Sequence, residues 1–492
     1  MANWSGARRI GVAGRTLWPT ARTGRARTTP WASRGLAAGA ASVGALALLV
    51  RLPWLHGRQV FFPAADTPGY VEMARSVGRG AVFAEGGLPR TPGYAWFVWA
   101  CDLLPGTPID NVATVQHLLG VALVVGVCLL AWRWLGAAAG LVLGVVLAVS
   151  PQLFAIEDEV LPDFLVAFLL AATVALAVAA ASAAGRRRWW LCAAVGATAG
   201  AATLVKPVAG LGLVALPAAL LTTGAGADGG GAHARAVLRG TLIAGGAALS
   251  CLLPLMVHNA VTHGKLAVSN QLGVTLFNRV FEVDGRPVPT GPSAQAETVA
   301  RVAVPRVAQG ERIHAAAYSA LMDRFGYDGW TAAGVERRLA LQEIGRYPVA
   351  YARRTVALAA GAAPSGRPDE AAASALLPRA GTSDTAIASW AWGWARRLGD
   401  AWWILALHGW AALFAIALAR GRARVALTTT LSVVVVGALA IAATHGGLSR
   451  YWWELAPLVT LLQVAGAVSV AGALLGALSA GRAGWPSPPS GR

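Results

Sequence analysis

The chain has 492 residues, of which 56% are hydrophobic and 13% are charged, and its mean hydropathy is +0.55. Soluble domains carry about 25% charged residues, so this composition excludes an ordinary soluble domain and indicates a membrane protein. The net charge of +18 comes mainly from arginines that are dispersed along the chain rather than gathered in one basic domain. We therefore expect membrane lipid and phosphate groups as partners, and no nucleic acid.

Ten stretches without charged residues follow one another along the chain. They are residues 35–50, 111–132, 134–156, 164–185, 189–205, 207–227, 240–257, 401–419, 425–443 and 455–480. Each is long enough, or nearly so, for the roughly 20 residues that a membrane-spanning helix requires. The sequence thus predicts an all-α integral membrane protein with roughly ten transmembrane helices.

The arginines between these stretches favour one orientation. They gather near residue 133, at 186–188, at 235–239, at 420–424 and at 482, as well as in residues 1–34. Because cytoplasmic segments carry the excess of lysine and arginine, we predict that both termini are cytoplasmic. The segments expected on the extracytoplasmic face are residues 55–110, 151–163, 206, 258–400 and 444–454.

Changes in composition predict five parts. They are a basic cytoplasmic tail (1–34), a transmembrane core (35–257) with a first outer loop at 55–110, an extracytoplasmic helical region (258–400), C-terminal transmembrane helices (401–480) and a second cytoplasmic tail (481–492). Within the extracytoplasmic region, residues 333–363 predict one helix with arginines and glutamates along one side. Residues 364–385 are rich in Pro, Ser, Gly and Ala, and they predict a mobile loop.

The first outer loop contains two similar motifs, Asp66-Thr-Pro-Gly-Tyr70 and Arg90-Thr-Pro-Gly-Tyr94. Thr67 is a suitable N-cap for a helix whose first position is Pro68, and a second short helix is expected to begin at Thr91-Pro92. The residues that would share the apolar face of the first helix are Tyr70, Met73, Ala74 and Val77. The pattern predicts amphipathic helices that lie along the membrane surface.

Asp66 is the leading candidate for chemistry. It precedes a helix N-terminus, where the N–H groups and the helix dipole favour an ionised carboxylate, and such a group can accept a proton from an incoming hydroxyl. The alternative is an Asx turn that only starts the helix. The second outer loop adds further acids at positions Glu157, Asp158, Glu159 and Asp163. Asp163 stands at the entrance to a predicted span, where a carboxylate is costly unless it is solvated, paired or metal-bound.

Cations suited to phosphate follow later in the chain. Lys206, one of two lysines, interrupts two apolar stretches, and Arg450-Tyr451 precedes the last one. Both cations could instead be interfacial anchors. Asn259 ends the seventh stretch on the same predicted face. The acidic cluster permits a divalent metal without fixing one, and no cofactor is otherwise indicated.

Taken in order, these residues resemble the GT-C superfamily of polyprenyl-phosphate-sugar glycosyltransferases, whose relatives include protein O-mannosyltransferases and the aminoarabinose transferases of lipid A. The matching positions are Asp66 with Tyr70, Arg90 with Tyr94, Asp163 at the fourth span, Lys206-Pro207, Asn259 and Arg450-Tyr451. The resemblance covers most of residues 35–480. Two departures concern the acceptor: Thr67 stands where the protein mannosyltransferases have a second acid, and Arg90-Thr91-Pro92 replaces Lys-Pro-Pro.

The resemblance implies a sugar donor carried on a polyprenyl phosphate in the cell envelope, and transfer to an extracytoplasmic acceptor with inversion at the anomeric carbon. By the same resemblance Asp66 is the general base, Asp163 is the second acid, with Glu159 as its alternative, and the remaining matching residues bind substrate. Lys206 and Arg450 are the cations expected beside the leaving phosphate.

Two other classes stay open at this point. A transporter or flippase of lipid-linked glycans would need a similar polar face, although transporters usually have internal repeats and charges near the middle of the membrane. A membrane scaffold without activity would use the extracytoplasmic region as an interaction surface. A transfer assay separates both from a glycosyltransferase.

Overall fold

The computed structural model describes residues 30–57, 66–83, 90–223, 230–290, 293–308, 312–362, 413, 415–444 and 454–483, and these residues contain helices and no strand. The helices of the apolar bundle are α1 (Pro30–Gly57), α4 (Pro108–Leu135), α5 (Ala137–Ala148), α6 (Pro151–Asp158), α7 (Asp163–Ala181), α8 (Gly185–Val205), η1 (Pro207–Val214), α9 (Ala215–Thr223), α10 (Gly230–His263), α19 (Gly421–Thr444) and α21 (Ala456–Ala483). The first loop forms α2 (Thr67–Gly78) and α3 (Gly93–Asp102). The more polar helices are α11 (Gln271–Phe277), η2 (Asn278–Val283), α12 (Ala294–Ala308), α13 (Ile313–Phe325), α14 (Gly329–Arg346) and α15 (Pro348–Ala362).

Six of the described helices are long and apolar enough to cross a membrane. The qualifying segments are Arg34–Leu52, Pro108–Leu135, Asp163–Ala181, Gly231–His263, Gly421–Thr444 and Ala456–Ala473. A seventh span is possible if α5 and α6, which are bent by 55° from each other, count as one. The chain is thus an all-α, multi-pass membrane protein, as predicted, while the predicted total of roughly ten spans includes residues 401–412, which lie outside the described residues.

Small residues allow the bundle helices to approach closely. A Cβ atom on Gly196 of α8 would come within 2.0 Å of the Ala244 carbonyl oxygen of α10, and one on Gly200 would come within 3.0 Å of the Ala248 oxygen. Glycine and alanine at four-residue spacing are the usual means of close packing between helices in lipid. The abundance of these residues in the sequence therefore has a packing role in this pair of helices.

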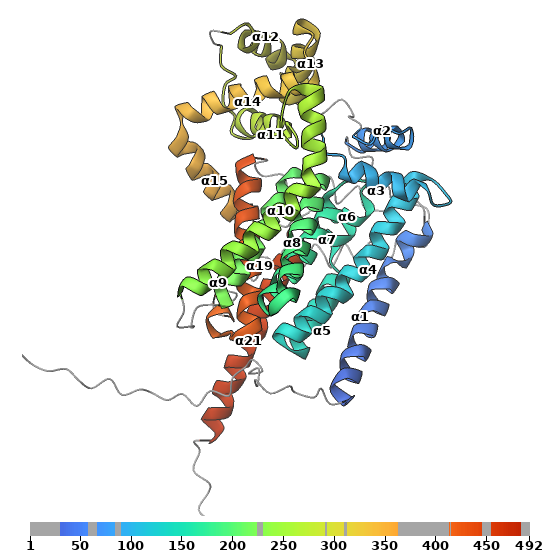
Figure 1. The fold of residues 1–492 in the computed structure, drawn as a ribbon, viewed down its shortest axis with the longest axis vertical. Coiled ribbons are helices and arrows are strands. Elements are labelled where there is room, and N and C mark those ends of the chain that lie inside the picture. The colour runs from blue at the N-terminus through green and yellow to red at the C-terminus, as the bar shows by residue number, and fades with distance from the viewer. Residues whose placement is uncertain are drawn as a thin grey trace, which may run out of the picture.

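The polar helices gather at one end of the bundle, the end where α2 and α3 also lie (Figure 1). They have an apolar core of their own, which includes Phe277, Phe281, Leu321, Val335 and Leu339. The helical region predicted at 258–400 is therefore present over its described part.

One predicted helix is wrong. The helix predicted at 333–363 is broken, because Tyr347 leaves helical geometry (φ −133°, ψ 50°) before Pro348, and α15 begins anew. Proline lacks the N–H that an uninterrupted helix needs and disfavours helical geometry in the preceding residue. Helix α1 begins at Pro30, and its apolar, membrane-length segment begins at Arg34. The predicted mobile loop at 364–385 lies outside the described residues.

Candidate functional site

The two Thr-Pro-Gly-Tyr motifs fasten α2 and α3 to the end of the bundle in parallel ways. The Thr67 hydroxyl donates to the carbonyl oxygen of Val160 at 3.2 Å, and the Thr91 hydroxyl donates to that of Val205 at 3.3 Å. Thr67 therefore does not act as the predicted N-cap: it is the first residue of α2 and binds the loop before α7 instead. The second motif places α3 against the last turn of α8, next to Lys206.

The glycine of each motif is needed for close approach. A Cβ atom at Gly69 would lie 2.0 Å from a guanidinium nitrogen of Arg90, and one at Gly93 would lie 2.6 Å from the backbone of Leu204. The tyrosines of the two motifs, Tyr70 and Tyr94, meet edge to face with ring centroids 5.0 Å apart.

Asp66 and Arg90 form an ion pair between the two motifs. The Arg90 Nη2 atom donates to Asp66 Oδ1 at 2.8 Å, and the guanidinium lies 5.1 Å from the centre of the Tyr70 ring. The Arg90 side chain is 8% exposed and that of Asp66 is 37% exposed, so the carboxylate is reachable while its partner is held by protein. Asp66 makes no capping hydrogen bond to α2.

A second charged cluster joins three segments that are distant in sequence. Lys206, after α8, pairs with Asp163 Oδ1 at 2.9 Å and also pairs with Glu454, directly before α21. All three side chains are at least 91% buried. As predicted, Asp163 occupies the first turn of α7, after Pro162.

An apolar layer connects this cluster to the two motifs. Tyr70, Met73 and Tyr94 pack in one buried group with Val160, Leu161, Val205 and Leu455, which flank the charged residues in sequence. Four of the predicted site residues are thereby attached to one packed unit: Asp66, Arg90, Asp163 and Lys206.

Burial changes the acid-base properties of this unit. It raises the pKa of Glu454 to about 8, an effect that the Lys206 ammonium opposes and the Asp163 carboxylate reinforces. Glu454 is therefore mostly protonated at neutral pH, which leaves Lys206 and Asp163 as a neutralised pair. Burial also raises the pKa of the Tyr70 and Tyr94 phenols, against the opposing effect of Arg90 on Tyr70. Both tyrosines thus act as neutral hydrogen-bonding groups.

Below the second loop lies a fully buried ion pair that the sequence did not indicate. Arg51 of α1 binds Glu157 through two hydrogen bonds, Nε to Oε2 at 2.8 Å and Nη2 to Oε1 at 2.7 Å. His117 Nδ1 lies 2.8 Å from the same Oε2 atom. Gly120 leaves the room for this carboxylate, because a Cβ atom there would lie 2.0 Å from Glu157 Oε1.

Gln116 links this buried pair to the site. Its amide nitrogen donates to the carbonyl oxygens of Glu157 and Glu159, each at 2.8 Å, and its amide oxygen accepts from the Tyr94 hydroxyl at 3.0 Å. The side chain thus holds both the second loop and α3. We assign the donor and acceptor ends of the amide from this network.

The remaining predicted residues have other positions. Asn259 binds the carbonyl oxygens of Ala267 and Val268 after α10, at 2.8 and 3.3 Å, and this contact fixes a turn. Glu159 is partly buried in the second loop. Arg450 and Tyr451 lie outside the described residues. Within the part of the chain that is described, no group of three or more His, Cys, Asp or Glu side chains forms a metal site.

Glu454 is the residue of the cluster that sequence analysis missed, although a signal existed. Like Asp163, it is an acid directly before an apolar stretch. Arg51 has a comparable sequence signal, because it is a cation at the end of the first apolar stretch. Gln116 has no such signal, since a single amide in an apolar helix does not indicate which residue it binds.

The comparisons with known proteins agree with the predicted family. A sequence model of the family described as dolichyl-phosphate-mannose-protein mannosyltransferase matches residues 89–265, the segment that contains Arg90, Tyr94, Asp163 and Lys206. No curated protein matches the chain.

Solved structures with a similar arrangement include ArnT from Cupriavidus metallidurans and the archaeal oligosaccharyltransferase AglB from Archaeoglobus fulgidus. The chain is 17% identical to ArnT in the apo state and 17% identical to ArnT bound to undecaprenyl phosphate, with 83% and 85% of this chain and 77% of ArnT covered, at TM-scores of 0.37 and 0.38. It is 12% identical to AglB, in complex with an inhibitory peptide and a dolichol-phosphate, with 91% of this chain and 52% of AglB covered at a TM-score of 0.47.

The apolar helices and the charged clusters at one end define a multi-pass membrane protein with a polar site. Over residues 89–265 of its 492, the chain is similar to the dolichyl-phosphate-mannose-protein mannosyltransferase family.

Proposed function

We propose that the protein moves a sugar from a polyprenyl-phosphate carrier to an acceptor on the extracytoplasmic side of the membrane, with inversion at the anomeric carbon. The observation that carries the proposal is the Asp66 carboxylate, which makes no capping bond, is 37% exposed, and is oriented by Arg90. A reachable carboxylate in a fixed position is what a general base requires.

In the proposed step an acceptor hydroxyl attacks the anomeric carbon of the donor. The new C–O bond forms as the bond to the carrier phosphate breaks, the hydroxyl proton passes to Asp66, and polyprenyl phosphate leaves. Arg90 donates a hydrogen bond to Oδ1 of the Asp66 carboxylate and so orients it. Carboxylates near the anomeric carbon also favour its developing positive charge.

We separately propose which cations contact the leaving phosphate. Lys206 and Arg450 are the candidates, and the protonation state of Glu454 affects Lys206. With Glu454 protonated, Lys206 faces one ionised carboxylate, that of Asp163, rather than two. A phosphate would then meet a neutral pair instead of a net negative cluster. Lys206→Met should weaken donor binding at least tenfold if this ammonium contacts the phosphate; unchanged donor binding in a folded variant would assign Lys206 to positioning Asp163.

Transfer itself is tested with membranes that contain the protein and a panel of radiolabelled polyprenyl-phosphate hexoses and pentoses. We expect label in an acceptor fraction, with an equal amount of free polyprenyl phosphate and with the opposite anomeric configuration in the product. A flippase would move the intact donor across the membrane without releasing the carrier phosphate. Release by none of the donors would refute the proposed function.

A further inference from the structure

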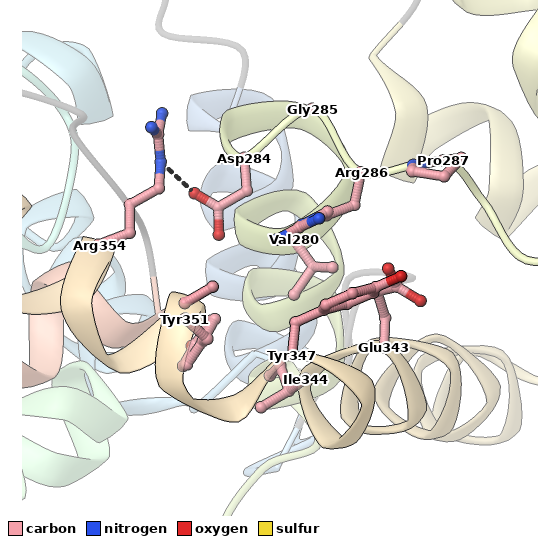
Figure 2. Close-up of a pocket in the computed structure, with 11 residues that line it drawn as sticks. Val280, Asp284, Gly285, Arg286, Pro287, Glu343, Ile344, Tyr347, Tyr351 and Arg354 are labelled. Atoms are coloured by element: carbon pink, nitrogen blue, oxygen red, sulfur yellow. Dashed lines mark ion pairs between the residues drawn. The ribbon is translucent and has the colours of Figure 1, made fainter.

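A cavity of about 280 Å³ lies where η2 ends beside the break between α14 and α15. The break exists because Pro348 ends α14, and it turns Tyr347 toward the cavity. Gly285, with a φ of +64°, turns the chain on the opposite side, a conformation that glycine adopts without strain. Figure 2 shows the side chains that surround this space, from η2 and its following loop above and from α14 and α15 below.

Carboxylates and guanidinium groups alternate around the cavity. Asp284 Oδ1 pairs with Arg354 Nε at 2.6 Å, and Glu343, whose carboxylate lies 3.2 Å from Arg346, faces a lining that also contains Arg286. The lining holds two carboxylates and two guanidinium groups, and Arg279 and Arg346 pair with these carboxylates from outside the lining. A ligand rich in hydroxyl groups needs alternating hydrogen-bond donors and acceptors, which these residues supply.

Two tyrosines give the cavity an apolar surface with polar edges. The Tyr347 side chain is 48% exposed, and Arg286 lies 4.5 Å from the centre of its ring. Tyr351 lines the same space. An aromatic ring with a polar handle suits the faces of a sugar, which has C–H groups on one side and hydroxyls around its rim. The volume is just below the roughly 300–1,000 Å³ of small-molecule pockets, so it admits one sugar ring rather than a long chain.

The floor of the cavity is attached to the last turn of α19. Arg279, fully buried, pairs with Asp284 and donates to the Ala442 carbonyl oxygen at 2.9 Å, and the Tyr351 hydroxyl donates to the Ala443 oxygen. Both carbonyls belong to the last turn of α19.

From this geometry we propose that the cavity binds one uncharged sugar residue of the acceptor, so that the acceptor is a neutral glycan. That this sugar belongs to the acceptor rests on the proposed function. The binding of a neutral sugar in the cavity does not depend on that function. Asp284, Glu343 and the arginines bind its hydroxyls, and Tyr347 contacts a face of its ring.

The test is binding of neutral oligosaccharides to the purified full chain in nanodiscs, without donor, followed by saturation-transfer NMR. The panel contains linear oligomers of a hexose and of a pentose, and inorganic phosphate is added as a competitor. We expect binding of at least one neutral oligomer and no competition by phosphate. Tyr347→Ala should weaken binding about tenfold, as for a typical aromatic anchor, while Tyr347→Phe should stay within about threefold of the wild type.

Arg353 provides the matched control, because it is exposed on α15 beside Arg354 and lies outside the cavity lining. Arg354→Ala should weaken binding, and Arg353→Ala should leave it unchanged. Three results would each overturn the proposal. They are no binding of any oligomer at millimolar concentration, competition by phosphate, and full binding by Tyr347→Ala. Because this binding experiment contains no donor, those results would not test the proposed transfer reaction. If the transfer assay shows no carrier release while the oligosaccharide still binds, the transfer reaction alone is overturned.

Discussion

Replacement of Arg51 by methionine should destabilise the protein strongly, because it leaves a carboxylate buried without its main partner. The Arg51 and Glu157 side chains are both fully buried and share two hydrogen bonds. After the substitution, Glu157 would keep the contact to His117 at 2.8 Å and lose its counter-charge.

The magnitude follows from the burial of the pair. Removal of one partner of a buried ion pair costs about 3–5 kcal/mol, which lowers the ratio of folded to unfolded protein more than a hundredfold. The Glu157→Gln change should cost a similar amount, since it strands the guanidinium. The double variant should be less destabilised than the sum of the two, by roughly 0.5–3 kcal/mol, because glutamine still binds His117 and no unpaired charge remains.

The assay is reversible unfolding of the purified protein in detergent or bicelles. An exposed pair gives the control: Arg79 and Glu72 are 3.1 Å apart with side chains 64% and 55% exposed, and Arg79→Met should change stability by no more than about 1 kcal/mol. If Arg51→Met and Arg79→Met have the same small effect, the buried pair does not hold the second loop in the way we describe.

Two further predictions concern topology and pH. Cysteines introduced at Glu85 should react with an impermeant reagent added to sealed cells, and cysteines at Gly230 should not; the reverse pattern would invert the predicted orientation. Because the folded-state pKa of Glu454 is raised from 4.5 to about 8, its protonated form contributes stability that is fully present below about pH 4.5 and is lost as the pH rises to about 8. Glu454→Gln should flatten the fall in stability between about pH 4.5 and 8, and an unchanged pH profile in that variant would remove Glu454 as its cause.

The fold class follows from the sequence because membrane helices leave a strong signal in hydropathy. The predicted amphipathic helix at Tyr70 and Met73 is confirmed, since both side chains are buried while Glu72 on the opposite face is exposed. A period of 3.6 residues and a proline at the helix start suffice for such a prediction. The break at Tyr347 could have been predicted from Pro348, and it is the break that opens the cavity.

The pairing of the site residues could not be predicted in the same way. Asp163 and Lys206 were separate candidates, and their ion pair joins the first turn of α7 to the residue after α8, two helices that pack against each other. Partner choice among dispersed charges is a property of the packed bundle rather than of local spacing. The same holds for Gln116, whose three hydrogen bonds join segments that are 22 to 43 residues away.

The most direct test of the central claim is the transfer rate of Asp66→Asn compared with the wild type and with Asp102→Asn, an exposed aspartate at the end of α3. Asparagine keeps the size of the side chain and an oxygen that accepts from Arg90, and it removes the proton acceptor. We predict that sugar transfer and carrier phosphate release fall by about 10² or more for Asp66→Asn, with donor binding and membrane protein levels unchanged, while Asp102→Asn behaves as the wild type. Near-normal transfer by Asp66→Asn would contradict the account and move the general base to Asp163.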